Sequence, residues 1–120
     1  MTQKTLTKAD LAQFTGTEHW YRHGLVRKVL YTDGVQYVAE LCGAYWLIDE
    51  IAFAQCNPKI AAEGFQFWQL AVKADHTATL SCTDGNYRRV HQKKLTFTDF
   101  PLDEISFYFT DNVILLPSEY

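Results

Sequence analysis

The fold is decided from residue 65 onward, in a stretch that begins Phe65-Gln66-Phe67-Trp68-Gln69-Leu70-Ala71-Val72-Lys73. Four further segments rich in β-branched and aromatic residues follow, at 77–83, 87–97, 105–110 and 113–116. Segments of this length and composition, separated by Gly, Pro, Asn and Asp, are typical of β-strands. We therefore expect the second half of the chain to form a meander.

Four Thr-Asp steps mark where the chain is expected to turn. They are Thr32-Asp33-Gly34, Thr83-Asp84-Gly85, Thr98-Asp99-Phe100 and Thr110-Asp111-Asn112. Asp-Gly and Asp-Asn supply the positive-φ residues that tight hairpins require, so the links at 84–86 and 111–112 predict two antiparallel strand pairs. The link at 33–34 is expected to end one or two strands within residues 19–31. A return strand is then expected over 35–41, with a helix as the open alternative.

Helical periodicity is strongest over about residues 44–55. Apolar residues recur there at helical spacing, at Ala44, Leu47, Ile48, Ile51 and Ala52, with Gln55 continuing the stripe. This pattern predicts one principal helix whose stripe faces a sheet. A capping arrangement at Thr7 and Asp10 predicts a short helix over 8–14, and Pro58 predicts another. The predicted fold class is α+β: a mostly antiparallel sheet of about five to seven strands, the principal helix packed on it, and one or two short helices.

Length and composition indicate one domain over residues 1–120. The chain has 120 residues, 48% of them hydrophobic and 15% aromatic, which is ample material for a core, and no stretch resembles a linker. Its net charge of -3 disfavours non-specific attraction to nucleic acid or to an anionic membrane. The first five residues carry no apolar signal core, and no apolar run is long enough to span a bilayer.

Three widely spaced cysteines indicate a reducing compartment. Cys42, Cys56 and Cys82 are odd in number and form no C-x-x-C pair, which fits free thiols better than a disulfide framework. We therefore expect a cytoplasmic protein that folds without a disulfide, metal or cofactor.

The predicted principal helix carries a second stripe opposite its apolar one. Trp46, Asp49, Glu50 and Phe53 follow i, i+3, i+4 and i+7 spacing. Aromatic residues beside charge are common at protein interfaces, so this stripe is a candidate interaction surface. The alternative is that the two aromatic side chains are covered within the same chain.

A second candidate surface is the polar and aromatic cluster at residues 18–24. It contains His19, Trp20 and His23, and the two histidines share a face whether the backbone is helical or extended. A metal site would need further ligands from other strands, such as His76 or His91. A histidine pair on a half-exposed strand is the more ordinary interpretation.

The basic run in the chain lies between residues 87 and 94. Tyr87, Arg88, Arg89 and Lys93 would suit contact with single-stranded nucleic acid. Lys and Arg also protect edge strands from unwanted pairing, and this is the favoured explanation. The sequence contains no Walker motif, G-x-G-x-x-G, G-x-S-x-G or H-E-x-x-H, which excludes the enzyme classes that carry them.

Several segments together are similar to a known family. They are His19–His23, Tyr31–Val35, Gly43–Ala52, Thr98–Glu104 and Leu115–Tyr120. They resemble a family of small uncharacterised bacterial proteins, met in cyanobacteria and on plasmids and phages, over nearly the whole chain. The resemblance implies a context of mobile elements, in which small acidic proteins often bind a host or defence protein. It implies no activity and no catalytic residues.

These observations favour a non-enzymatic protein-interaction module. We expect a protein partner at the stripe on residues 46–53 or at the 19–23 cluster, with self-association as a variant. The alternatives are a small-ligand or metal-binding enzyme that uses His19 and His23, and a single-stranded nucleic-acid binder that uses the 87–94 strand.

Overall fold

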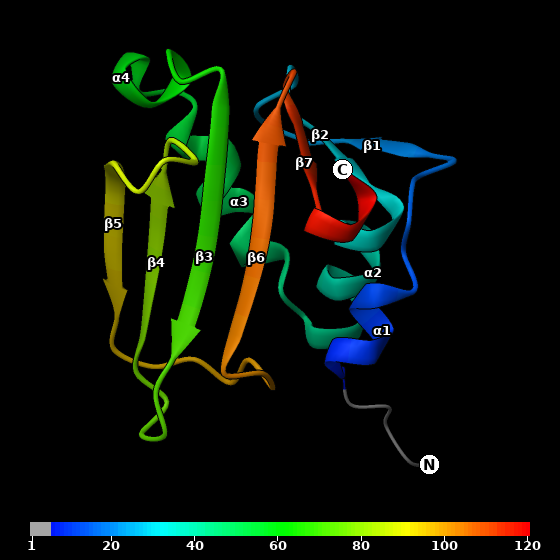
Figure 1. Cartoon of the computed structure of the whole chain (residues 1–120), viewed down its shortest axis with the longest axis vertical. Helices are drawn as coiled ribbons and strands as arrows, with labels where there is room; N and C mark the ends of the chain where they lie inside the picture. The colour runs from blue at the N-terminus through cyan, green and yellow to red at the C-terminus, as the bar shows by residue number, and fades with distance from the viewer. Residues whose placement is uncertain (1–5) are drawn as a thin grey trace.

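The protein is built around one seven-stranded sheet (Figure 1), seen in a computed structural model that describes residues 6–120. The predicted lack of a signal core at residues 1–5 lies outside the described residues. The strands are β1 (Trp20–Arg22), β2 (Leu30–Thr32), β3 (Phe65–Val72), β4 (Ala78–Thr83), β5 (Arg89–Leu95), β6 (Glu104–Thr110) and β7 (Val113–Leu115). Their order is β1-β2-β7-β6-β3-β4-β5, and every pair is antiparallel except β2 with β7. The predicted α+β fold with a mostly antiparallel sheet is confirmed.

The strands of the second half do not form a simple meander. β5 lies at one edge of the sheet, and β6 returns to pair with β3 in the middle. This arrangement places Ile105, Phe107 and Phe109 beside Trp68 and Leu70, all buried. A strand added outside β5 would leave its apolar face at the margin of the core, so burial selects the central position.

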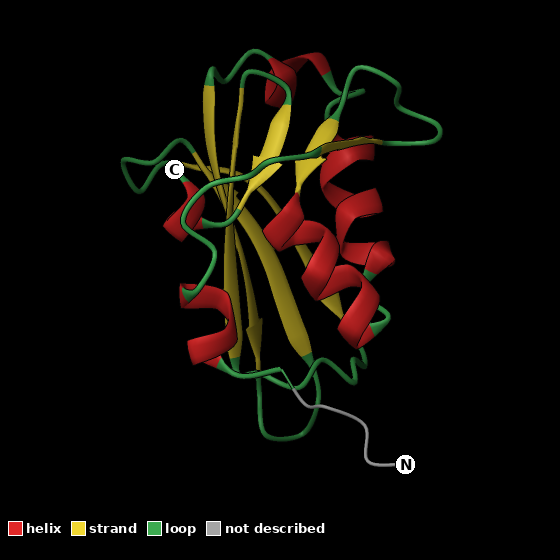
Figure 2. Ribbon diagram, turned by 90° about the vertical axis from the view of Figure 1, so that its right-hand side faces the viewer, coloured by secondary structure: helices red, strands yellow, loops and turns green. Residues whose placement is uncertain are grey.

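Helices cover the two faces of the sheet unequally (Figure 2). The helices α2 (Asp33–Cys42) and α3 (Tyr45–Ala54) pack on one face and bury their apolar sides against it. The short helix α4 (Pro58–Ala61) follows α3. On the other side of the sheet the described residues place only the short helix α1 (Lys8–Ala12) and the 3-10 turn η1 (Pro117–Glu119), which stand beside β6.

The return strand expected at residues 35–41 is wrong, because the chain forms α2 there. Thr32 caps the helix, with its side chain accepting the Val35 N–H at 3.4 Å. Glu119 adds a carboxylate at the same end: Thr32 Oγ1 donates to its Oε1 at 2.6 Å and the Gly34 N–H to its Oε2 at 3.2 Å. Thr and Asp favour helix N-caps as well as turns, so the Thr-Asp step misled the prediction at this position.

The other local predictions are confirmed. Asp111 and Asn112 have positive φ in a two-residue turn between β6 and β7, and residues 84–88 close the β4–β5 hairpin. A capping box joins Thr7 and Asp10 at the start of α1. β5 is an edge strand. Within the described residues no helix is long and apolar enough to cross a membrane.

A buried amide pair joins the helical layer to β3. Gln66 and Gln55 exchange side-chain hydrogen bonds of 2.8 and 2.9 Å, and the Trp68 indole N–H donates to Gln66 Oε1 at 2.9 Å. The remaining amide hydrogens donate to the carbonyls of Ile51 and Ile60. Each amide is satisfied, so β3 can turn a glutamine inward and its neighbouring phenylalanines outward.

Candidate functional site: the open face of the sheet

Within residues 6–120, no helix covers the face of β3, β4, β5 and β6 that points away from α2 and α3 (Figures 1 and 2). Alternation along β3 sends Gln66, Trp68 and Leu70 into the core, and therefore Phe65 and Phe67 to the opposite side, where both are half-buried. The same alternation in β6 sends Tyr108 to that side. We call this surface the open face.

Aromatic rings gather at one end of the open face. The ring centroid of Tyr108 lies 5.0 Å from that of Phe65 and 5.8 Å from that of Phe67. Tyr120 completes the group with edge-on contacts at 5.8 Å to Phe65 and 5.3 Å to Tyr108. Tyr87 stands at the tip of the β4–β5 hairpin with 98% of its surface exposed. We call these five side chains the aromatic cluster.

The aromatic cluster borders a cavity of about 390 Å³. Its lining consists of Phe65, Phe67, Gln69, Thr83, Gly85, Tyr87 and Tyr108. None of these side chains is charged, and the polar ones are an amide and hydroxyls. The cavity can therefore hold apolar or aromatic groups and offer a few hydrogen bonds at its rim.

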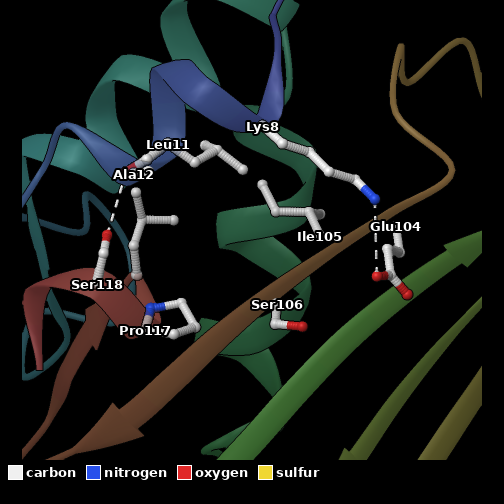
Figure 3. Close-up of a pocket in the computed structure, with 9 residues that line it drawn as sticks. Lys8, Leu11, Ala12, Glu104, Ile105, Ser106, Pro117 and Ser118 are labelled. Carbon is white, nitrogen blue, oxygen red and sulfur yellow. Dashed lines mark hydrogen bonds and ion pairs between the residues drawn. The ribbon is translucent and has the colours of Figure 1, made fainter.

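A second hollow adjoins the same face at β6 (Figure 3). It has a volume of about 260 Å³ and lies between α1, η1 and β6, with Leu11, Ala12 and Pro117 on its apolar side and Ser106 on the strand. The Ser118 hydroxyl donates to the Leu11 carbonyl at 3.1 Å and so ties the two short elements together. Lys8 lies 3.5 Å from Asp103 and 4.0 Å from Glu104 at the other end of the hollow.

The predicted basic strand does not form one cationic surface. Arg88 is paired with Glu63 and Asp84. Lys93 points to the helical side, where it meets Glu50 of α3 at 2.5 Å. Arg89 lies on the open face and donates to Gln92 at 2.9 Å. The charges are thus divided between the two faces of β5.

The predicted stripe on α3 is partly engaged inside the chain. Glu50 pairs with Lys93, and Asp49 accepts a hydrogen bond from His23. Trp46 is half-buried against the core. Phe53 keeps 46% of its surface exposed, with the His23 ring packed edge-on against it at 5.5 Å. The stripe therefore presents one exposed aromatic ring rather than two.

His19 and His23 lie on either side of β1 and contact different carboxylates. His23 is buried: its Nε2 lies 2.7 Å from Asp49 Oδ1, and its Nδ1 accepts the backbone N–H groups of Leu25 and Val26. This pattern assigns the ring proton to Nε2 and occupies both nitrogens, so the histidine fixes the β1–β2 loop. Exposed His19 lies 3.4 Å from Asp33.

Asp33 organises the segment before β1. Its carboxylate accepts the backbone N–H groups of Glu18 and His19 and the Tyr21 hydroxyl. The N–H of Glu18, followed by the other donors, lowers the pKa of Asp33 despite the opposing effect of burial. Trp20 beside it is 56% exposed. Among residues 6–120 no three His, Cys, Asp or Glu side chains converge in a way that could hold a metal ion, so His76 and His91 do not join the other histidines.

The cysteines are free thiols in different surroundings. Cys56 is exposed, Cys42 is half-buried and Cys82 is buried under the sheet. Burial, reinforced by the nearby carboxylates of Glu63 and Asp84, raises the pKa of the Cys82 thiol to about 12. Cys82 therefore remains protonated and acts as a core residue.

The aromatic cluster is not among the candidate sites predicted from the sequence. Phe65 and Phe67 are spaced two apart in a strand, a signal that they share a face. The sequence does not show which face of the strand is covered, because each face carries one glutamine, Gln66 on one and Gln69 on the other. Tyr108 and Tyr120 join the cluster only through the β3–β6 pairing and the position of η1.

Together the fold and the site define an α+β protein with helices packed on one face of a seven-stranded sheet and an open aromatic patch on the other. Within that class, the chain belongs to the family of unknown function DUF6876, whose model matches residues 5–120. No curated protein and no solved structure matches it. The expected membership of an uncharacterised family is confirmed, and the family brings no activity with it.

Proposed function

We propose that this protein is a non-enzymatic protein-interaction module that binds its partner through the open face. The observation that carries the proposal is the aromatic cluster, in which Phe65, Phe67 and Tyr108 line an uncharged cavity on a sheet face that none of the described helices covers. Interface centres are enriched in aromatic residues and depleted in charge, and they are bordered by polar groups. Gln69, Thr83 and the other hydroxyl groups around the cavity supply such a border.

The surroundings of the cluster favour protein over nucleic acid as the partner. Single-stranded nucleic acids need cations along the path of their phosphates as well as rings on which bases stack. Arg88 is paired with two carboxylates and Lys93 points to the other face, so of these strand cations only Arg89 and Lys94, at opposite ends of β5, lie on the open face. The net charge of -3 opposes the approach of a polyanion.

The polar side chains singled out in the sequence support a binding role over a catalytic one. Both ring nitrogens of His23 are occupied by hydrogen bonds within the chain, so this side chain offers no free base. Asp49 and Glu50 each hold a basic partner. A catalytic acid or base must instead reach a proton on the substrate.

We also propose a cytoplasmic location, which three free thiols support. A role within mobile elements remains a prediction that rests on the resemblance described above.

The proposal is tested by comparing two faces of the molecule in affinity capture from a bacterial host after nuclease treatment. The double variant Phe67→Ser with Tyr108→Ser removes the floor of the cavity, and the double variant Trp46→Ala with Phe53→Ala removes the aromatic rings of the α3 stripe. Circular dichroism melting establishes that each variant is folded.

We expect the open-face variant to lose the captured protein and the α3 variant to retain it. Retention by the folded open-face variant, with loss by the α3 variant, would move the contact surface to the helix. Capture that disappears on nuclease treatment would replace the protein partner with nucleic acid.

A further inference from the structure

Side chains on the open face form three rows across β6, β3, β4 and β5, as the strand registers show. The first row consists of Tyr108, Phe67, Thr83 and Arg89, and the second of Ser106, Gln69, Ser81 and Gln92. The third consists of Glu104, Ala71, Thr79 and Lys94. Each row has chemically different ends: an aromatic ring and a cation, two neutral polar groups, and an acid and a base.

Each row is complementary to the same row of a second copy when that copy is rotated by a two-fold axis. A two-fold axis parallel to the strands and midway between β3 and β4 places β6 of one copy opposite β5 of the other. Every row then meets itself in reverse. Tyr108 faces Arg89, Ser106 faces Gln92, and Glu104 faces Lys94. Cation–π, hydrogen-bonding and ionic pairs would thus form at both ends of one interface.

We propose that the partner of the open face is a second copy of this chain, bound through the two-fold arrangement just described. The inference rests on the proposed function, because it assigns a partner to the same surface. Sheets that pack face to face lie about 10 Å apart with their strands roughly aligned, which suits side chains of the sizes found in these rows.

The protruding β4–β5 hairpin and the hollow beside β6 also fit a second copy of the chain. The same axis carries the β4–β5 hairpin of one copy over the β3–β6 end of the other, so that Tyr87 reaches Phe65, Tyr108 and Tyr120. This contact would cover the ring at the hairpin tip, which is 98% exposed in the single chain. The β5 edge of each copy would lie beside the hollow between α1 and β6 (Figure 3).

Charge at the third row supports the pairing. Asp103 and Glu104 together face one lysine, Lys8, so this corner of the face keeps a net negative charge. Lys94 at the far end of the same row is exposed. The two-fold axis brings each lysine to the acidic corner of the other copy, and the contact occurs twice.

The size of the face sets the expected strength. Four strands spaced about 4.8 Å apart and about seven residues long give roughly 19 by 24 Å, or about 450 Å² for each copy. The total of about 900 Å² lies below the range of stable interfaces, so we expect a weak dimer whose population depends on concentration.

Sedimentation equilibrium of the full chain between about 1 and 500 µM tests the proposal. We expect wild-type protein to pass from monomer to dimer over this range. Lys94→Glu places like charges together at both ends and should weaken association at least about fivefold, since the change acts twice. Adding Glu104→Lys to Lys94→Glu restores opposite charges and should recover most of the loss. Lys28→Glu, in the β1–β2 loop, is the matched control and should leave association unchanged.

Two results would overturn the inference. One is a wild-type monomer at every concentration; the other is a dimer that neither Lys94→Glu nor the double variant Phe67→Ser with Tyr108→Ser weakens. Affinity capture then decides whether the proposed function survives. It survives if wild-type protein captures a protein other than itself and the double variant Phe67→Ser with Tyr108→Ser does not. If that variant loses no protein at all, the proposed function fails as well.

Discussion

Replacing Gln66 by leucine should destabilise the fold far more than replacing its partner Gln55. In Gln66→Leu the buried Trp68 N–H and the Gln55 side-chain oxygen both lose the hydrogen bonds described above. Each unsatisfied buried group costs about 1–3 kcal/mol, and the added apolar burial offsets about 1–2 kcal/mol of the sum. Taking the middle of each range, about 4 kcal/mol less about 1.5 kcal/mol, we expect a net loss of about 2–3 kcal/mol from the free energy of unfolding.

Gln55→Leu leaves a smaller defect. Gln66 still donates to the Ile60 carbonyl and accepts from Trp68, so the expected loss is about 1 kcal/mol. In the double variant Gln55→Leu with Gln66→Leu, the Gln55 side-chain oxygen is absent, so it cannot be left buried without a hydrogen bond. The double variant should therefore be less destabilised than the sum of the two single changes by at least about 1 kcal/mol.

Urea unfolding at 25 °C, followed by circular dichroism at 222 nm, measures these differences without relying on the fluorescence of Trp68. Two results would refute the reasoning: a Gln66→Leu variant within about 0.5 kcal/mol of wild type, or strictly additive single changes.

Three further predictions concern other parts of the chain. Gly34→Ala places a Cβ 2.6 Å from Glu119 Oε1 and should displace that carboxylate from the start of α2, with a loss of about 1–3 kcal/mol in urea unfolding; an unchanged midpoint would contradict it. In native protein, a thiol reagent monitored by mass spectrometry should modify Cys56 rapidly and spare Cys82 until urea unfolds the chain, and equal rates would contradict the burial of Cys82. Because the pKa of Asp33 is lowered by folding, its contribution is complete above its unfolded value of about 3.9 and is lost as the pH falls through the lower folded value. The urea midpoint of Asp33→Asn should therefore lie below that of wild type at pH 7 and approach it below about pH 4, and a gap that widens on acidification would contradict the assignment.

Local patterns in the sequence predict most of the elements, because each depends on residues close together in the chain. The Thr7–Asp10 capping box, the apolar stripe over residues 44–55 and the Asp111-Asn112 turn each recur in the structure. The residues Thr32-Asp33-Gly34 fit a helix N-cap as well as a turn, and a distant residue favours the cap. Glu119, 85 residues away from Gly34, supplies the carboxylate that completes the cap of α2.

The open face could not be predicted in the same way. In β3 the apolar residues Phe65 and Phe67 point outward while Gln66 points into the core beside Trp68 and Leu70, so neither face of the strand is purely apolar or purely polar. The amide is tolerated inside because Gln55 and the Ile60 carbonyl satisfy it, and this partnership depends on how α3 and α4 pack on the sheet. Tertiary contacts therefore decide which residues of β3 face the core, and with that they decide where the aromatic cluster lies.

The candidate surfaces named from the sequence differ from the open face for a similar reason. Asp49 and Glu50 look available on a helical wheel, but His23 reaches Asp49 from the loop after β1, and Lys93 reaches Glu50 from β5. A helical pattern shows which residues share a side, and it does not show what another strand brings to that side.

The most direct test of the central claim is a photo-crosslinking scan of this protein in a bacterial host. The photoreactive residue benzoylphenylalanine would replace Gln69 or Ser81 on the open face, Phe53 on α3, or Lys28 as the control. Mass spectrometry would identify the protein joined at each position. We expect protein adducts, with a second copy among them, from the two open-face positions and none from the control. Adducts from Phe53 alone, with none from Gln69 or Ser81, would contradict it.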